Sequence, residues 1–296
     1  MKKMSDARLM LLAGLASVLT AVVLISVKLV AWYLSGSVAM LASLVDSLMD
    51  AAASLVNLFA IRYSLVPADS EHRFGHGKAE ALAGLGQAVL ITLSAMFLLN
   101  ESVGRLLSPQ PLQATTLAVG VMLFSIVVTL MLLRLQSYTV RRTGSTAVEA
   151  DSLHYLSDVA MNGGILLALL GAAYGWMWLD GLAGLLIGLY VLRAAWQVGN
   201  QSVQLLLDRE MSADVRHIIA GIVAEHPQAL GFHQLRTRQS GRTCFIQMHV
   251  DMDENLTLRD AHTLVDSIER RIQEQFPDAD VLIHQDPVKV APRVPV

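Results

Sequence analysis

Six long apolar stretches fill the first 207 residues, and they constrain the fold more than any other feature of the chain. A helix that crosses a bilayer needs about 20 mostly apolar residues. The stretches cover residues 9–27, 37–61, 81–100, 113–133, 159–179 and 181–207, the fifth with a polar lead-in from Glu149. The first is longer than the ~7–15-residue core of a signal peptide, so we interpret it as a spanning helix too. The sequence predicts an α-helical membrane protein with six transmembrane helices.

Charge divides the chain into two domains. Charged residues make up 16% of the sequence, against about 25% in soluble domains, which argues against an ordinary soluble enzyme. Residues 1–207 contain 12 Lys or Arg and 11 Asp or Glu, whereas residues 208–296 contain 10 and 14. We therefore predict a transmembrane domain at 1–207 and a soluble domain at 208–296. The net charge of −3 is too balanced to indicate a nucleic-acid partner.

The basic residues of the loops set the predicted orientation. With six spans, the amino terminus, the second and fourth loops and the soluble domain share one side of the membrane. Before the soluble domain, that side carries nine Lys or Arg: Lys2, Lys3, Arg8, Arg62, Arg73, Lys78, Arg134, Arg141 and Arg142. The other side carries Arg105 alone. Because cytoplasmic loops are enriched in Lys and Arg, both termini are expected in the cytoplasm.

The soluble domain has the pattern of a small α/β fold. Helical spacing of apolar residues covers 213–225, and a second amphipathic helix covers 257–276. Alternating strands at 232–238 and 243–251 flank a Ser-Gly turn, and a third strand covers 280–284. The predicted order is αββαβ. The single cysteine, Cys244, excludes an intrachain disulfide and a multi-cysteine metal site.

Ionisable residues interrupt two of the predicted spans. An Asp at the centre of a spanning helix costs about 2.5–3.5 kcal/mol on insertion scales, so such residues are usually functional. Asp46 and Asp50 are four residues apart in the second span, and His154 and Asp158 have the same spacing at the fifth. Each pair lies on one helix face. If the two faces meet, three carboxylates and one imidazole converge, which suits tetrahedral Zn²⁺.

The alternative is that these carboxylates form structural ion pairs with Lys28 or Arg193. Asn57 lies two turns after Asp50, and we interpret it as an interhelical hydrogen-bonding residue. Asp151 lies one turn before His154, and we expect it at the cytoplasmic mouth, outside the site.

Two further groups of metal-ligand residues lie outside the spans. Asp69, His72 and His76 fall within eight residues of a loop; spacing alone leaves open a metal site or a solvated polar loop. In the soluble domain, histidines lie on adjoining predicted elements, and two of them are followed by Asp two residues later on the same strand face. This arrangement predicts a metal cluster around four histidines: His233, His249, His262 and His284. We interpret Asp251, His217 and His226 as surface residues.

Taken in order on this topology, the motifs resemble those of the cation diffusion facilitator family over roughly residues 8–287. Asp46-Ser-Leu-Met-Asp50 and His154-Tyr-Leu-Ser-Asp158 are similar to its transport-site pattern, and residues 69–80 are similar to its second hallmark. The resemblance implies a second zinc site at Asp69, His72 and His76. It also implies a binuclear site at a dimer interface of the soluble domain, with Asp286 bridging both ions, formed by His233, His249, His262, His284 and Asp286.

The same resemblance implies an ion pair between Lys78 and Asp208 that links the two domains. It further implies a homodimer in the bacterial inner membrane that exchanges metal for protons, close to the bacterial zinc and ferrous-iron efflux proteins. Zn²⁺ is expected both as substrate and as a structural or regulatory ion, and no organic cofactor is expected.

The expected function is therefore efflux of Zn²⁺, with Cd²⁺ and Fe²⁺ as further substrates, by alternating access and proton antiport. Ca²⁺ and Mg²⁺ are disfavoured because they prefer six or more oxygen ligands. An enzyme is not expected, since the chain lacks the His-Glu-x-x-His motif of a membrane metalloprotease. The remaining alternative is a membrane-tethered zinc sensor that transports nothing.

Overall fold

The computed structural model describes residues 5–36, 38–108, 116–174, 176 and 178–289. The chain divides into two compact units, Met1–Val203 and Gln204–Val296. The predicted domain boundary after residue 207 falls close to this division and stays a prediction.

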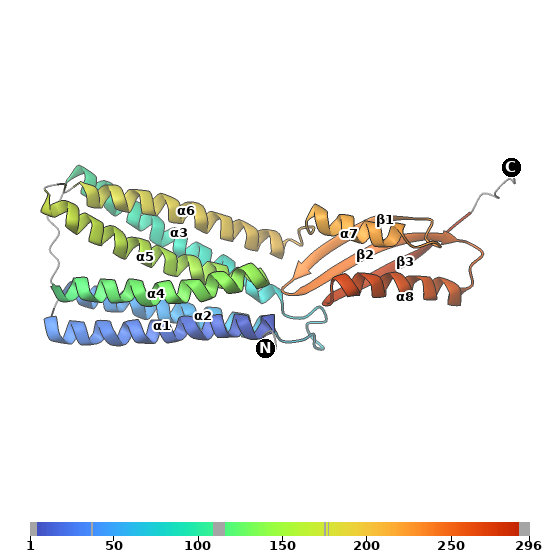
Figure 1. Cartoon of the computed structure of the whole chain (residues 1–296), viewed down its shortest axis with the longest axis horizontal. Coiled ribbons are helices and arrows are strands. Elements are labelled where there is room, and N and C mark those ends of the chain that lie inside the picture. The colour runs from blue at the N-terminus through green and yellow to red at the C-terminus, as the bar shows by residue number, and fades with distance from the viewer. Residues whose placement is uncertain (1–4, 37, 109–115, 175, 177, 290–296) are drawn as a thin grey trace. The chain divides into compact units, whose positions relative to one another are not determined.

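The first unit is a bundle of long helices (Figure 1). They are α1 (Asp6–Ser35), α2 (Val38–Ser64), α3 (Lys78–Leu107), α4 (Thr116–Thr143), α5 (Thr146–Ala173) and α6 (Leu179–Leu206). Within the described residues, six helices are long and apolar enough to cross a membrane, which confirms the predicted number. We call the end of the bundle that carries Asp6 and Ser64 the termini end, and the end that carries Ser35 and Leu107 the far end.

Two helices differ from their predicted bounds. Helix α5 begins at Thr146, thirteen residues before the predicted span at 159, because its polar lead-in is helical as well. Helix α1 runs past Lys28 to Ser35 and ends at Gly36, whose φ of 60° is the left-handed conformation that glycine adopts easily. The predicted start of the fourth span at residue 113, and Lys2 and Lys3, lie outside the described residues.

Lys28 can remain inside α1 because α2 satisfies its ammonium group. Its Nζ donates to the carbonyl oxygen of Ser43 at 3.2 Å and to Ser47 Oγ at 2.6 Å. The side chain is buried in this contact. A buried ammonium group needs such acceptors, so Lys28 joins α1 to α2 through hydrogen bonds.

Small residues allow α3 and α6 to pack closely near the far end. A Cβ atom on Gly181 would lie 2.9 Å from the backbone nitrogen of Leu106 and 3.0 Å from the carbonyl oxygen of Ser102. On Gly184 it would lie 2.3 Å from Ser102 Oγ. Glycine at these positions brings the two backbones together, as small residues do at many membrane helix interfaces.

Substitution of Gly181 by alanine is therefore expected to lower the thermal stability of the purified protein. The new methyl group meets backbone atoms that have no rotamer to change, so the helices must separate, at a cost of about 1–3 kcal/mol. Gly104→Ala is the matched control, because a Cβ there has no neighbour within 4 Å. The measurement is thermal unfolding in detergent, and equal melting temperatures for the two variants would contradict this packing.

The second unit contains α7 (Ala213–Ala224), β1 (Gly231–Ser240), β2 (Thr243–Asp253), α8 (Leu258–Gln275) and β3 (Ala279–Val288). This order confirms the predicted αββαβ fold. The sheet has the order β1-β2-β3, with β1 antiparallel and β3 parallel to β2. The predicted Ser-Gly turn joins β1 to β2, with Gly241 at a φ of 56°.

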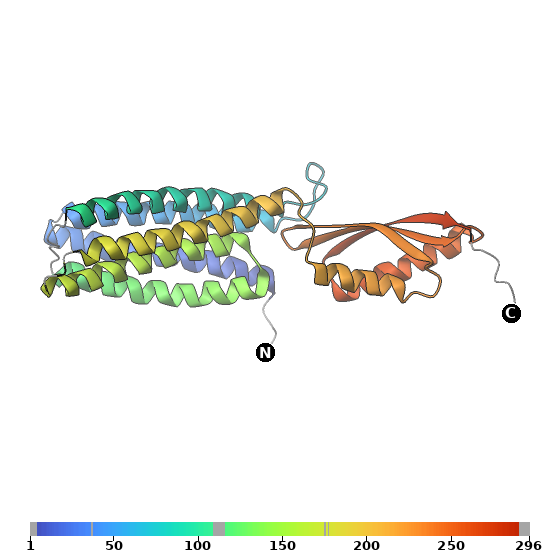
Figure 2. The ribbon, with the colours of Figure 1, turned by 90° about the horizontal axis from the view of Figure 1, so that it is seen from above.

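The two helices of this unit cover one face of the sheet (Figure 2). On β2, alternate residues from Ile246 to Met252 are buried against α7 and α8. Side chains alternate between the two faces of a strand. The intervening residues of β2, which include His249 and Asp251, therefore lie on the face that carries no helix.

Candidate functional site

Helices α2 and α5 bring three of the four predicted transport-site residues together. His154 Nε2 lies 2.8 Å from Asp50 Oδ1. One ligand atom from each of Asp50, His154 and Asp158 lies within 4.8 Å of the others. All three side chains are partly buried. The facing i, i+4 pairs of the sequence thus become a compact group of two carboxylates and one imidazole inside the helix bundle.

Asp46 is the exception among the four. It lies one turn before Asp50 on α2, but its side chain is exposed and does not belong to the group of three. The fourth predicted ligand is therefore near Asp50 along α2, but its side chain lies outside the group of Asp50, His154 and Asp158. Its role stays a prediction.

The structure does not support the ion-pair alternative for these carboxylates. Lys28 is occupied by its hydrogen bonds to α2, and Arg193 is exposed. Over the described part of the chain, no Lys or Arg lies within 4.0 Å of a carboxylate oxygen of Asp46, Asp50 or Asp158. A divalent cation in this place would supply the missing positive charge, and oxygen and imidazole nitrogen are ligands that Zn²⁺ accepts.

Asp151 does not lie at a mouth of the bundle, so that prediction was wrong. Its side chain is 1% exposed and accepts hydrogen bonds from other helices. Asn57 behaves as predicted: its Nδ2 donates to the carbonyl oxygen of Ala147 at 3.2 Å and joins α2 to α5.

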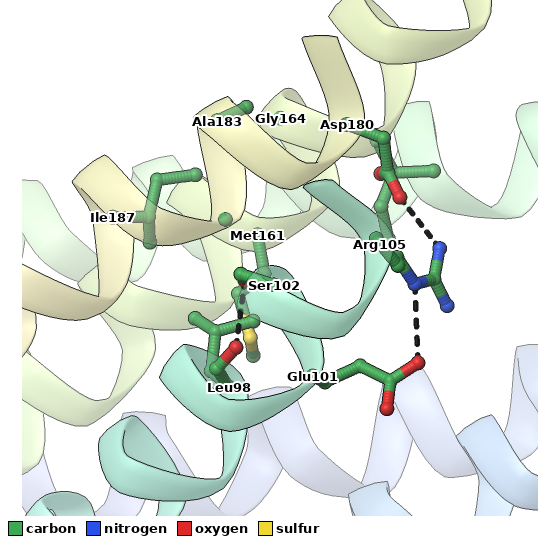
Figure 3. A pocket seen from close by; sticks show the side chains of 11 residues that line it. Leu98, Glu101, Ser102, Arg105, Met161, Gly164, Asp180, Ala183 and Ile187 are labelled. Carbon is green, nitrogen blue, oxygen red and sulfur yellow. Dashed lines mark hydrogen bonds and ion pairs between the residues drawn. The ribbon is translucent and has the colours of Figure 1, made fainter. Parts of the chain in front are cut away.

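A cavity of about 130 Å³ lies between α3, α5 and α6 toward the far end (Figure 3). Its wall includes Met161, one turn beyond Asp158 on α5. Most of its lining is apolar, but Arg105 binds Asp180 at 2.6 Å and Glu101 at 3.2 Å beside it. This cavity could not be predicted from the sequence, because its walls come from three separate helices.

The loop between α2 and α3 gathers Asp69, His72 and His76 into a second group with metal-ligand spacing. Asp69 Oδ2 lies 3.4 Å from His76 Nε2, and its Oδ1 lies 3.6 Å from His72 Nδ1. His76 is 6% exposed, and its Nδ1 lies 3.3 Å from the carbonyl oxygen of Val66. That contact leaves Nε2 facing Asp69.

Backbone hydrogen bonds hold the Asp69 carboxylate in place. The amides of His72 and Glu71 donate to Oδ1 at 2.6 and 2.9 Å. The hydrogen bond from His72 is the main reason that the pKa of Asp69 lies below its ordinary value. The loop thus presents an ionised carboxylate between two imidazoles.

In the second unit, the sheet register aligns three histidines across three strands. His233 on β1 is opposite His249 on β2, which is opposite His284 on β3. In the next row of the same face, Gly231 is opposite Asp251, which is opposite Asp286. The ring centroids of the first two histidines are 5.0 Å apart, and those of the second two are 4.6 Å apart.

Asp286 contacts all three of these imidazoles. Its carboxylate oxygens lie 2.8 Å from His249, 3.1 Å from His233 and 3.3 Å from His284. The hydrogen bond from His249 is the main reason that the pKa of Asp286 lies below its ordinary value. Three imidazole nitrogens and a carboxylate form a donor set that fits Zn²⁺.

Two other residues of the second unit differ in their distance from the histidine row and Asp286. His262 is on α8 and contacts Asp266 at 3.5 Å, and in the described structure it does not belong to the group of His233, His249 and Asp286. Asp251, interpreted as a surface residue, instead lies 3.5 Å from His233.

The remaining predictions for the tail concern three further residues. His217 is exposed as predicted. His226 lies 2.7 Å from Ser267 Oγ, and burial lowers its pKa. Asp208 belongs to the second unit and Lys78 to the first, so an ion pair between them stays a prediction.

Comparison with known proteins identifies the family. A model of the cation efflux transmembrane domain matches residues 14–207, and a model of the cytoplasmic domain of cation efflux proteins matches residues 211–288. The chain belongs to the cation efflux, or cation diffusion facilitator, family. It is a multi-pass membrane protein and a cation efflux transporter.

Similar proteins cover nearly the whole chain. A cation-efflux pump FieF of Shewanella oneidensis is 52% identical over 281 residues, which is 95% of this chain and 95% of the relative. A protein of the same name from Yersinia enterocolitica is 50% identical over 97% of this chain and 96% of the relative. The solved metal-bound C-terminal domain of a CzcD transporter from Thermotoga maritima is 28% identical, with a TM-score of 0.25, and covers 26% of this chain and 94% of that one.

Proposed function

We propose that this transporter exports Zn²⁺ from the cytoplasm by exchange for protons, with Cd²⁺ and Fe²⁺ as further substrates. The observation that carries the proposal is the group of Asp50, His154 and Asp158 within the spanning helices. Ionisable groups are costly in a membrane and usually mark an ion pathway. A site of two or three carboxylates and one imidazole favours a borderline divalent ion over Ca²⁺ or Mg²⁺.

Proton coupling follows from the chemistry of the ligands. Carboxylate and imidazole must be deprotonated to bind a metal ion, so the ion and protons compete for the same lone pairs. In the inward-open state, metal binds to Asp50, His154 and Asp158, with Asp46 as the fourth ligand. After the helices change orientation, protons from the outer side replace the metal. An inward proton gradient thereby drives metal outward.

The tail and the loop are proposed to bind zinc that is not transported. The net charge of residues 208–296 is −4, because they contain 10 basic and 14 acidic residues. Two such tails repel each other in a homodimer, and zinc bound at the histidine row would offset that repulsion. His262, which lies apart from the row in one chain, would complete a binuclear site with Asp286 bridging both ions.

The loop residues Asp69, His72 and His76 form a separate zinc site near the membrane surface. The charge of the loops supports both termini in the cytoplasm, and the similarity to bacterial efflux pumps supports a placement in the bacterial inner membrane. The Lys78–Asp208 ion pair would then lie where the helices meet the tail.

The test is a flux measurement on purified protein in proteoliposomes that contain a zinc-sensitive dye. Zinc movement is expected only with the protein present, and its rate should rise as the opposing proton gradient increases. A matched pH-sensitive dye should report proton movement in the opposite direction, and a series with Zn²⁺, Cd²⁺, Fe²⁺ and Mn²⁺ gives the substrate order. A membrane-tethered sensor would bind zinc at the tail but show no flux, and that result would reject the proposal.

A further inference from the structure

One buried carboxyl group in the helix bundle has no role in the function proposed above. Asp151 accepts hydrogen bonds from four of the other helices of the bundle. The donors are Ser17 Oγ on α1 at 2.5 Å, Gln136 Nε2 on α4 at 2.7 Å, Ser54 Oγ on α2 at 3.4 Å and Gln87 Nε2 on α3 at 3.5 Å. A single side chain therefore joins α5 to α1, α2, α3 and α4.

The partners of this carboxyl group are neutral. Among the described residues, no Lys, Arg or His lies within 4.0 Å of its oxygens. An ionised carboxylate only accepts hydrogen bonds, and each of these partners can donate one. Tyr155, also buried, adds to the cluster through contacts with Ser54 Oγ at 3.0 Å and the carbonyl oxygen of Ser17 at 3.2 Å. Asp151, its four donors and Tyr155 thus form one buried polar cluster, and removal of a member leaves other buried groups without partners.

This cluster lies next to the transport-site residues on both helices that supply them. On α5, Asp151 is one turn before His154, on the side toward the termini end. On α2, Ser54 is one turn after Asp50, on the same side. The link between Ser54 and Asp151 therefore holds α2 and α5 in register one turn away from the contact between Asp50 and His154.

The distance between the ligand atoms of Asp50 and His154 determines which size of ion fits between them. Bonds of about 2.0–2.2 Å place the ligand atoms of a tetrahedral zinc site about 3.4 Å apart. Asp50 Oδ1 and His154 Nε2 are 2.8 Å apart. A small opening admits zinc, whereas a larger ion with longer bonds needs α2 and α5 to move further apart.

We propose that Asp151 is a positioning residue of the transport site, which holds α5 at the height and rotation that fit Zn²⁺ better than a larger divalent ion. The proposal rests on the transport site described under the proposed function. It assigns to Asp151 no contact with the metal. Its carboxylate acts through the helices that carry the ligands.

The first variant is Asp151→Asn, which keeps the size of the side chain and removes its charge. The new amide can be accommodated, because the buried Oε1 of Gln136 has no hydrogen-bond partner and can turn to accept from it. We expect the KM for Zn²⁺ to rise about tenfold and the preference for Zn²⁺ over Cd²⁺ to fall by a similar factor, as when a residue that orients a metal ligand is lost. The value of kcat should change less than KM.

Ser17→Ala is the second variant, since it removes one donor on α1 and leaves α5 intact. It should shift the Zn²⁺ to Cd²⁺ preference in the same direction by a smaller factor. Asn57→Ser is the matched control. Asn57 is also buried and joins α2 to α5, but its bond to Ala147 lies two turns from His154. It should lower thermal stability without changing the preference.

The decisive measurement is equilibrium affinity for Zn²⁺ and Cd²⁺ on the full chain in detergent, by competition with a chelating dye. The part of the binding that Asp50→Ala removes defines the transport site. The proposal is overturned if Asp151→Asn and Ser17→Ala leave the affinity ratio unchanged, or if Asn57→Ser shifts it equally. Because this readout does not need transport, absence of flux in the unmodified protein would count against the proposed function alone.

Discussion

Replacement of Asp50 by alanine is expected to lower zinc flux in proteoliposomes by more than about 100-fold, together with the accompanying proton movement. The change removes a proposed metal ligand and also the hydrogen-bond partner that His154 has at 2.8 Å. Loss of a residue that only supports a ligand costs about 10–100-fold, and loss of the ligand itself should exceed that. Protein level and melting temperature establish that the variant folds.

Two further variants distinguish loss of a carboxylate at the proposed transport site from loss of a carboxylate elsewhere in the protein. Glu101→Gln removes an exposed carboxylate from α3 and should leave flux within about twofold, since exposed ion pairs contribute little. Asp46→Ala, which changes the proposed fourth ligand, should have a smaller effect than Asp50→Ala, because Asp46 is exposed and lies outside the group that Asp50, His154 and Asp158 form. Flux that survives Asp50→Ala would reject the transport-site assignment.

The sequence was sufficient to predict the six spanning helices and the αββαβ fold of the tail. It was not sufficient to predict where α5 begins. Hydropathy identified the apolar part of that helix from residue 159 onward. It treated the preceding residues as a polar lead-in, although they continue the same helix from Thr146. Hydropathy reports where a segment contacts lipid, whereas a helix continues wherever neighbouring helices satisfy its polar side chains. Since His154 and Asp151 lie in that lead-in, the functional part of α5 is its less hydrophobic half.

The convergence of Asp50, His154 and Asp158 was predictable, but the role of Asp151 was not. Spacing of four residues places ligands on one helix face whatever the neighbours are. The surroundings of Asp151 depend on Ser17, Ser54, Gln87 and Gln136, residues of ordinary types on four different helices. Their approach to one carboxylate is a property of tertiary packing. The one available signal was that Asp151 precedes His154 by a single turn.

The tail illustrates the same distinction. Alternation along a strand predicted that His249 and Asp251 share a face, as do His284 and Asp286. The alignment of His233 depends on an irregularity in the ladder between His233 and Arg236, which the sequence does not reveal. His262 is on α8, whereas the histidine row lies on the face of the sheet that carries no helix, so His262 lies outside the group within one chain.

Asp286→Asn is expected to remove most of the zinc bound to the tail and to weaken association of two chains. Asp286 is the carboxylate that contacts His233, His249 and His284 together. An amide binds zinc much less readily than a carboxylate, and it cannot offset the positive charge of two ions. Zinc content per chain, measured on the purified protein, should fall, and the fraction of dimer at low protein concentration should fall with it.

Asp280→Asn is the matched control, since it makes the same charge change on the same face of β3 but lies opposite Phe245, away from the histidine row. It should leave zinc content unchanged. Because contact with His249 lowers the pKa of Asp286, the stability that its ionised form contributes is fully present above the ordinary carboxyl value of about 3.9 and is lost only as the pH falls through the lower folded value. The Asp286 carboxylate should thus remain ionised at mildly acidic pH. If the unmodified protein and Asp286→Asn have equal zinc content and equal dimer fractions, the zinc-linked dimer is contradicted.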